Sequence, residues 1–184
     1  MKRVLWYMAP ILVPLYLCAL LMLQSCNPFA PTFDDTLVDR SKLLGDRKTI
    51  KGFFDYFRNT YEIRDSTLYG RMLNRGFIFQ WYDFSTGRNI YWGRDQEMLS
   101  TYKMFTNRSV KSVTLSWGDD YVLADTLTGD TVARVERFFE LTLLIEDGND
   151  QTSLKSFGRA NMTLNRLNRQ SDWKISYWID KYNY

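Results

Sequence analysis

The sequence predicts an α+β domain in which helices pack on an antiparallel sheet. In separate stretches between residues 50 and 107, apolar residues recur every three or four positions, which is typical of amphipathic helices. Beyond Val110 the spacing changes to two, which is typical of strands with one buried and one wetter face. The 184-residue chain is long enough for one domain with a sizeable core.

Three helices are expected in the first half of the chain. The first carries an apolar stripe at helical spacing, made of Ile50, Phe53, Phe54, Phe57 and Tyr61. A second is expected after Asp65-Ser66, where either side chain can cap the first turn, and Gly76 is expected to end it. A third is expected from Arg94 or Asp95 to about Asn107, with Asp95 as its cap and Asn107 as its stop.

The expected strands fall into two groups. Residues 77–82 and 89–92 are aromatic and β-prone, and the turn-forming residues between them indicate a hairpin. Four further alternating runs lie around residues 113–117, 139–146, 154–165 and 173–177. Turn-rich pieces such as Gly118-Asp119-Asp120 separate these runs, so they predict an antiparallel meander packed on the helices.

The N-terminus reads as a secretion signal. Residues 1–3 carry two positive charges, residues 4–23 form an uncharged apolar stretch, and Leu23-Gln24-Ser25-Cys26 follows directly. This pattern resembles the lipobox of bacterial lipoproteins, which implies cleavage before Cys26 and acylation of that cysteine. A signal anchor is the alternative, because the apolar stretch reaches the roughly 20 residues that a membrane helix needs. Both interpretations place the rest of the chain outside the cytoplasm and attach it to a membrane.

The lipoprotein interpretation divides the chain into three parts. Residues 1–25 are the signal peptide, residues 26–45 are the lipidated cysteine with a flexible tether, and residues 46–184 are the folded domain. Asn27 is not the aspartate that retains many enterobacterial lipoproteins at the inner membrane. The expected location is therefore the outer membrane, with the domain facing the periplasm.

Composition excludes several classes of function. The net charge is +3 and falls to +1 when Lys2 and Arg3 are removed, so no nucleic-acid partner is expected. The chain has no histidine, which excludes serine–histidine and cysteine–histidine nucleophiles and histidine-based zinc sites. No glycine-rich phosphate loop is present, and we expect neither a cofactor nor a metal.

Several carboxylates lie in or beside predicted turns and could in principle attract calcium. They are Asp119, Asp120, Asp125, Asp130, Glu146, Asp147 and Asp150. Their spacing does not match a helix–loop–helix calcium site. We therefore interpret them as solvated turn residues.

The order of elements resembles the nuclear-transport-factor-2-like fold, the cone-shaped domain shared with SnoaL-like cyclases and ketosteroid isomerase. The resemblance covers about residues 46–182 and rests on short stretches in the family's order. These are Tyr61 to Asp65, Tyr69 to Leu73, Phe77 to Phe79, Trp92 to Arg94, and Asp172 to Asp180. It implies three helices packed on a strongly curved antiparallel sheet, with a conical cavity whose mouth serves ligand binding, catalysis or dimerisation.

The resemblance places residues of the hairpin and the third helix near that cavity. The candidate pocket residues are Trp81, Asp83, Tyr91, Trp92, Met98, Tyr102 and Phe105. The alternative is that these aromatic residues are simply core, which is the more frequent role of rings at regular spacing.

Three functions stay open at this level. The leading hypothesis is a non-catalytic lipoprotein whose domain binds a small apolar ligand or an envelope partner protein. The second is a dimerising assembly module that uses the open face of its sheet, where Phe157, Trp178 and Tyr182 were expected to contribute. The third is an isomerase- or cyclase-like enzyme, which needs a carboxylate base and a hydroxyl or acid that holds an oxyanion. Its candidate residues are Asp55, Asp83 and Asp180 with Tyr56, Tyr69, Tyr91 and Tyr102.

Overall fold

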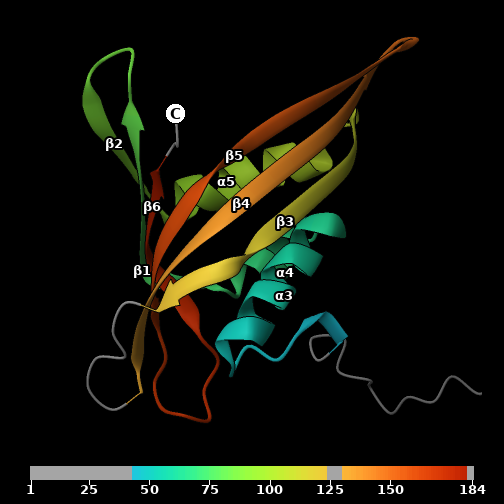
Figure 1. Cartoon of the computed structure of the whole chain (residues 1–184). Helices are drawn as coiled ribbons and strands as arrows, with labels where there is room; N and C mark the ends of the chain where they lie inside the picture. Colours follow the sequence, from blue (N-terminus) through green and yellow to red (C-terminus); the bar gives the residue numbers. More distant parts are fainter. Residues whose placement is uncertain (1–42, 124–129, 182–184) are drawn as a thin grey trace, which may run out of the picture. The chain divides into compact units, whose positions relative to one another are not determined.

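A curved six-stranded sheet is the main element of the structure, with the helices on one of its faces (Figure 1). The computed structural model describes residues 43–123 and 130–181, which belong to one unit spanning Asp39–Tyr184. The strand order is β2-β1-β6-β5-β4-β3. The strands are β1 (Leu73–Asp83), β2 (Arg88–Gly93), β3 (Val110–Leu123), β4 (Val132–Asp147), β5 (Asp150–Asn165) and β6 (Lys174–Lys181).

Two of the three helices begin after a residue whose side chain caps the first turn, whereas the predicted cap of the third, Asp95, lies inside that helix. Helix α3 (Ile50–Glu62) starts after Thr49, whose hydroxyl accepts a hydrogen bond from a backbone N–H of its first turn. Helix α4 (Ser66–Gly70) starts after Asp65, which accepts from the Leu68 N–H and so acts as the predicted cap. Helix α5 (Arg94–Thr106) starts after Gly93, without a side-chain cap, and ends before Asn107.

The sheet is mixed, which corrects the expectation of a wholly antiparallel sheet. Strands β3 to β6 form the predicted antiparallel meander, and β1 pairs with β2 as the predicted hairpin. However, β1 runs parallel to β6. The hairpin and the meander are separate antiparallel units joined through α5. The alternation of apolar and polar residues within a strand does not indicate whether the strands that meet at the border between the two units run parallel or antiparallel.

Two glycines predicted to end elements lie within strands instead. Gly76 belongs to β1, because α4 ends at Gly70 and the chain extends from Leu73 onward. Gly118 lies within β3, next to a shift of register. Between Trp117 and Tyr121, β3 advances four residues while its partner β4 advances only two. Such a bulge bends a strand and increases its twist, which contributes to the curvature of the sheet.

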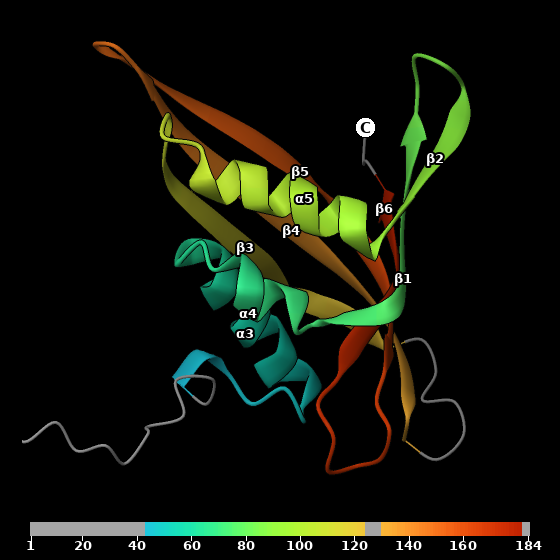
Figure 2. The same ribbon diagram turned by 180° about the vertical axis from the view of Figure 1, so that it is seen from behind.

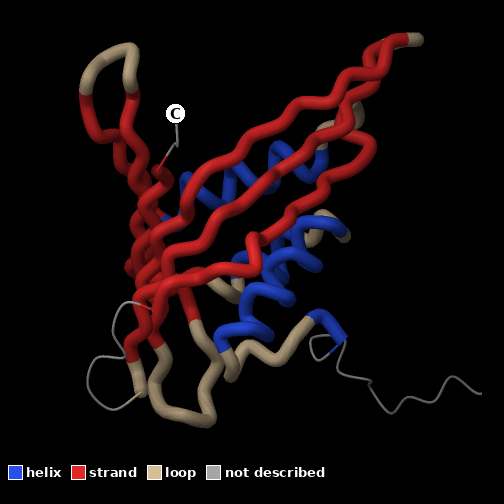
Figure 3. Tube along the Cα trace, in the orientation of Figure 1, coloured by secondary structure: helices blue, strands red, loops and turns tan. Residues whose placement is uncertain are grey.

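The aromatic stripe of α3 packs against the inner face of this curved sheet. Figure 2 shows α3, α4 and α5 in front of strands β3, β4 and β5. Figure 3 shows that β4 and β5 extend together beyond the helices as a long hairpin. The buried α3 rings are Phe53, Phe54, Tyr56, Phe57 and Tyr61. No helix in the described ranges is long and apolar enough to cross a membrane.

Phe57 lies at the centre of the packing. Its ring has centroid distances of 5.0 Å to Tyr61, 5.5 Å to Tyr69, 5.3 Å to Trp117 and 5.7 Å to Trp178. These partners come from α3, α4, β3 and β6, so one fully buried side chain joins two helices to distant strands of the sheet. Aromatic pairs at these separations add to the stabilisation from buried area.

Replacing Phe57 by alanine should therefore lower the free energy of unfolding by about 3–5 kcal/mol, the usual cost of removing a buried ring. The matched control is Phe157→Ala, because Phe157 lies on β5 and is 53% exposed. The control should change the free energy of unfolding by no more than about 0.5 kcal/mol. Chemical denaturation of both variants checks the prediction, and equal effects would contradict the central role of Phe57.

Candidate functional site

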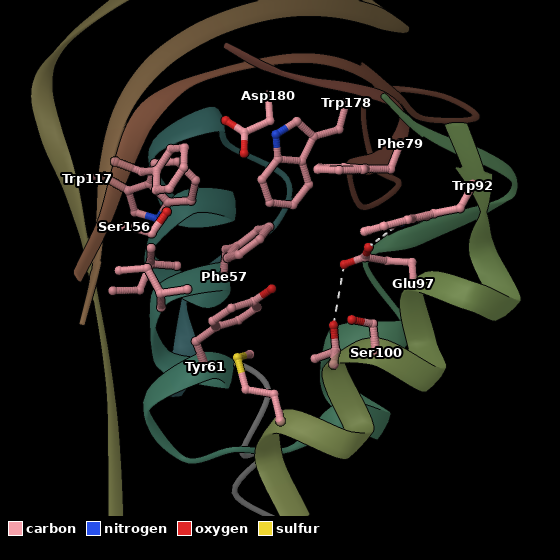
Figure 4. A pocket seen from close by; sticks show the side chains of 15 residues that line it. Phe57, Tyr61, Phe79, Trp92, Glu97, Ser100, Trp117, Ser156, Trp178 and Asp180 are labelled. Atoms are coloured by element: carbon pink, nitrogen blue, oxygen red, sulfur yellow. Dashed lines mark hydrogen bonds between the residues drawn. The ribbon is translucent and has the colours of Figure 1, made fainter. Parts of the chain in front are cut away.

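A cavity of about 200 Å³ lies between α3, α5 and the inner face of the sheet (Figure 4). Its wall is mainly aromatic. The rings that line it are Phe57, Tyr61, Phe79, Trp92, Trp117, Phe139 and Trp178. The polar side chains that line it are Glu97, Ser100, Thr101, Ser156 and Asp180. The two carboxyl groups are the obvious chemical features of this cavity.

Glu97 is a buried carboxylate held by three uncharged donors. Only 6% of the residue is exposed. The Tyr69 hydroxyl donates to Oε1 at 2.6 Å, the Trp92 indole N–H donates to Oε2 at 2.7 Å, and the Thr101 hydroxyl lies 3.3 Å from Oε1. Burial, followed by the charge of Glu97, raises the pKa of Tyr69 well above its usual value. Tyr69 therefore stays protonated and donates, and Glu97 acts as a fixed acceptor.

The opposite part of the cavity has polar atoms that lack partners. They are the indole N–H groups of Trp117 and Trp178 and the Oδ1 oxygen of Asp180, and none has a hydrogen-bond partner within the described part of the chain. Trp178 is only 8% exposed. An unpaired buried donor or acceptor costs about 1–3 kcal/mol, so three of them at one cavity require an explanation.

Asp180, on β6, has room for its carboxyl group because Gly158 on the neighbouring strand β5 has no side chain. A Cβ atom at Gly158 would lie 3.2 Å from Asp180 Oδ1 and 2.9 Å from the Lys181 carbonyl oxygen, so glycine leaves the space that the carboxyl group occupies. Burial raises the pKa of Asp180 to about 6. Among the described residues, no positively charged group offsets the cost of burying the ionised carboxyl, as one would in a structural ion pair. The carboxyl can accept a hydrogen bond or a proton from a molecule in the cavity.

Of the pocket residues predicted from the resemblance, Trp92 lines this cavity. Trp81 lies beside it, with its ring 4.4 Å from that of Trp92. Phe105 is buried in the core, with its ring 5.1 Å from that of Tyr61. Met98 faces α4, where its terminal atoms lie close to Gly70, and it lines a separate groove.

The other predicted pocket residues lie away from this cavity. Tyr91 and Tyr102 are 56% and 53% exposed. Asp83 caps a turn by accepting hydrogen bonds from the backbone N–H and hydroxyl of Ser85 and from the hydroxyl of Thr86. The hairpin and α5 thus contribute one edge of the site, but of the residues predicted for it only Trp92 lines the cavity.

The residues named for the assembly module and for the enzyme can also be located in the structure. Asp55, considered as a base, is on the polar face of α3 and forms an ion pair with Lys51 at 2.7 Å. Trp178, considered for an open assembly face, points to the inner face of the sheet, whereas Phe157 is exposed. Asp180 is the one of the three candidate bases that lines the cavity. Tyr182 and Cys26 lie outside the described residues.

Most of the cavity residues were not singled out from the sequence. Glu97, Trp117 and Ser156 come from α5, β3 and β5. The one available signal was Glu97, a charged residue on the face of α5 that also carries Thr101 and Phe105, all three of which are buried. A buried acid within an apolar pattern is unusual unless it is paired. Within the described residues, no group of three or more potential ligands is arranged to hold a metal ion.

The raised pKa of Asp180 predicts how stability depends on pH. The folded chain holds the proton of Asp180 more tightly than the unfolded chain does, so the free energy of unfolding should fall as pH rises from about 4 to about 6. Asp180→Asn removes this loss. Because the carboxyl is not fully buried, we expect the variant to be more stable by about 1–2 kcal/mol at pH 8 and unchanged at pH 4.

The control for this prediction is Asp83→Asn. The hydrogen bonds from Ser85 and Thr86 lower the pKa of Asp83, so its ionised form is favoured in the folded chain. Neutralising Asp83 should give no gain at pH 8. Denaturant unfolding at both pH values measures the difference, and equal behaviour of the two variants would contradict the assigned environment of Asp180.

Comparisons with known proteins were informative only at the level of structure. No protein-family model and no curated protein matches the chain. A putative scytalone dehydratase from Novosphingobium aromaticivorans superposes with a TM-score of 0.59 at 10% identity, over 79% of this chain and 89% of that one. A nuclear-transport-factor-2-like superfamily protein from Salmonella enterica superposes with a TM-score of 0.56 at 15% identity, over 75% and 91%.

A third similar structure is a subunit of an enzyme. The beta subunit of benzoate 1,2-dioxygenase from Burkholderia mallei superposes with a TM-score of 0.57 at 13% identity, over 71% of this chain and 86% of that one. Identities this low establish a common architecture and leave the activity open. The described part of the chain therefore has the nuclear-transport-factor-2-like fold, an α+β fold built on a curved mixed sheet.

Proposed function

We propose that the domain binds a small, largely apolar molecule in the cavity between α3, α5 and the sheet. The observation that carries this proposal is that three residues lining the cavity, Trp117, Trp178 and Asp180, each have a buried polar atom without a partner in the described part of the chain. A bound molecule with polar groups would satisfy them and would remove their cost to stability. A cavity retained only by imperfect packing would be lined by apolar atoms.

The dimensions and the wall restrict the ligand. A volume of about 200 Å³ is below the roughly 300–1,000 Å³ typical of pockets for drug-sized molecules, so the ligand is small. Seven aromatic rings line the space, and they supply contact area for an apolar or aromatic body. The polar atoms then fix its orientation.

Binding without catalysis is our preferred interpretation. Catalysis by a carboxylate base requires donors that stabilise the charge developing on the substrate. Two of the potential donors, Tyr69 and Trp92, are already hydrogen-bonded to Glu97, which leaves only the indole N–H groups of Trp117 and Trp178 unpaired among the buried donors described at this cavity. The structurally similar proteins include a putative dehydratase and a dioxygenase subunit, so the fold itself does not favour either role.

A proton-transfer enzyme is the second candidate, because Asp180 has a pKa of about 6 and lines the same cavity as Trp117 and Trp178, whose indole N–H groups lack partners in the described part of the chain. The two candidates differ in the fate of the bound molecule. Recovery of the ligand unchanged supports binding, whereas conversion that is lost in Asp180→Asn would establish the enzyme.

We also propose that the chain is a lipoprotein held at the envelope membrane through an acylated Cys26. The apolar stretch before Leu23-Gln24-Ser25-Cys26 supports this proposal. A membrane-attached domain would sample molecules within the periplasm. A signal anchor would give the same attachment without cleavage.

The ligand proposal predicts that filling the cavity prevents binding. Native mass spectrometry of the full chain purified in mild detergent should show a small bound molecule that denaturation releases. Ser156→Leu places three carbons where a hydroxyl lines the cavity, and it should abolish that signal. The matched control is Ser153→Leu, on an exposed position of the same strand, which should retain the ligand. Retention by both variants would exclude the cavity as the binding site.

The lipoprotein proposal predicts acylation at one residue. In bacteria fed with labelled palmitate, the full chain should incorporate label and fractionate with membranes. Cys26→Ser should lose the label and remain at its unprocessed length. If Cys26→Ser were processed and located as the wild type, the lipid attachment would be wrong, and an unlabelled wild-type chain in the membrane would indicate the signal anchor.

A further inference from the structure

We propose that the ligand is a small organic cation, an amine that is protonated at neutral pH, held between the aromatic rings and the carboxylate of Asp180. The inference rests on the proposed function, since it assigns the charge of the molecule that occupies the same cavity. It follows from the distribution of charge around the cavity, from the arrangement of the rings and from the free oxygen of Asp180.

The charge around the cavity is negative. Its lining contains Glu97 and Asp180 but no lysine or arginine, and the chain has no histidine. The three groups that hydrogen-bond Glu97 are neutral, so they stabilise its charge without cancelling it. Charges interact more strongly in a partly dehydrated cavity than in water. A cation therefore gains energy on entering the cavity, and a carboxylate or phosphate is repelled.

The positive charge of Arg137, on β4, does not cancel the negative charge around the cavity. The guanidinium of Arg137 lies 4.9 Å from the centroid of the Phe54 ring and donates to the Gly118 carbonyl. It is not among the residues that line the cavity. The ring of Phe54 lies 4.8 Å from that of Trp117, and of these two residues only Trp117 lines the cavity.

The rings around the cavity form the kind of site that binds ammonium groups. Figure 4 shows Trp117 and Trp92 on opposite sides, Phe57 and Tyr61 between them, and Asp180 beside Trp178 at one end. The faces of aromatic rings carry negative charge and attract a desolvated cation by about 2 kcal/mol. Several rings with a carboxylate at one end complement an ammonium group on a small apolar body.

The free polar atoms specify the orientation of that cation. A protonated amine has donors and no acceptor, so it can donate to the unpartnered Oδ1 of Asp180. The indole N–H groups of Trp117 and Trp178 can only donate, and they require an acceptor. An amine that also carries a hydroxyl close to its nitrogen offers both the donor for Asp180 and an acceptor for an indole N–H.

The test compares probes of one shape and different charge. Phenethylammonium, phenethyl alcohol and phenylacetate share a benzene ring and a short chain, and they end in a positive, a neutral and a negative group. Isothermal titration of the full chain in detergent should show phenethylammonium binding at least about tenfold tighter than the alcohol, with no measurable binding of phenylacetate. Phenylethanolamine, which adds a hydroxyl, should bind more tightly than phenethylammonium.

Asp180→Asn separates charge recognition from simple occupancy. This variant should lose at least about tenfold in affinity for phenethylammonium and should bind the alcohol as before. Its folding is safeguarded by the stability gain predicted above. Ser156→Leu, which fills the cavity, should bind none of the probes.

The outcomes distinguish the two proposals. Equal binding of the alcohol and the ammonium, or preferred binding of phenylacetate, would overturn the cation inference, and loss of that binding in Ser156→Leu would leave the proposed function standing. Ammonium binding that is unchanged in Asp180→Asn would likewise overturn it. Failure of every probe to bind the wild type would contradict both proposals.

Discussion

The structure depends on one constraint, which is that a helix rich in aromatic residues must fit inside a sheet that curves around it. Phe57 meets this constraint at the centre, where its ring contacts rings from α4, β3 and β6. Phe57 and its partner rings Trp117 and Trp178 also line the cavity, so the packing that stabilises the fold and the candidate site share the same side chains.

Two carboxyl groups of the cavity illustrate two different solutions for a buried acid. Glu97 is surrounded by donors from α4, β2 and its own helix, and it links these elements to one another. Asp180 has an unpartnered oxygen and a raised pKa. A polar group that contributes nothing to internal hydrogen bonding and weakens the fold is a stronger functional candidate than one that is fully satisfied.

Much of the fold could be predicted from the sequence, because hydrophobic spacing reports directly on which face of an element is buried. The α3 stripe, the Asp65 cap, the hairpin and the meander are confirmed. The parallel pairing of β1 with β6 could not be predicted, since it depends on how two separate units meet. Gly118 looked like a turn because a bulge and a turn use the same residue types.

The site was harder to predict than the fold. Buried rings have the same spacing whether they border a cavity or a solid core, so Trp117 and Phe57 carried no distinguishing signal. Asp180 was named among three carboxylates, but its location depended on the space above Gly158, which is a property of the neighbouring strand. Trp92 was the predicted pocket residue found at this cavity, because it lies where the hairpin meets α5.

The distribution of tryptophan has a practical consequence for work on this chain. Three of its six tryptophans, Trp92, Trp117 and Trp178, line one small cavity, and the ring of Trp81 lies against that of Trp92. Any molecule that enters this space changes the surroundings of several indoles at once. The intrinsic fluorescence of the chain should therefore report occupancy without a label, so mixtures of compounds can be screened optically.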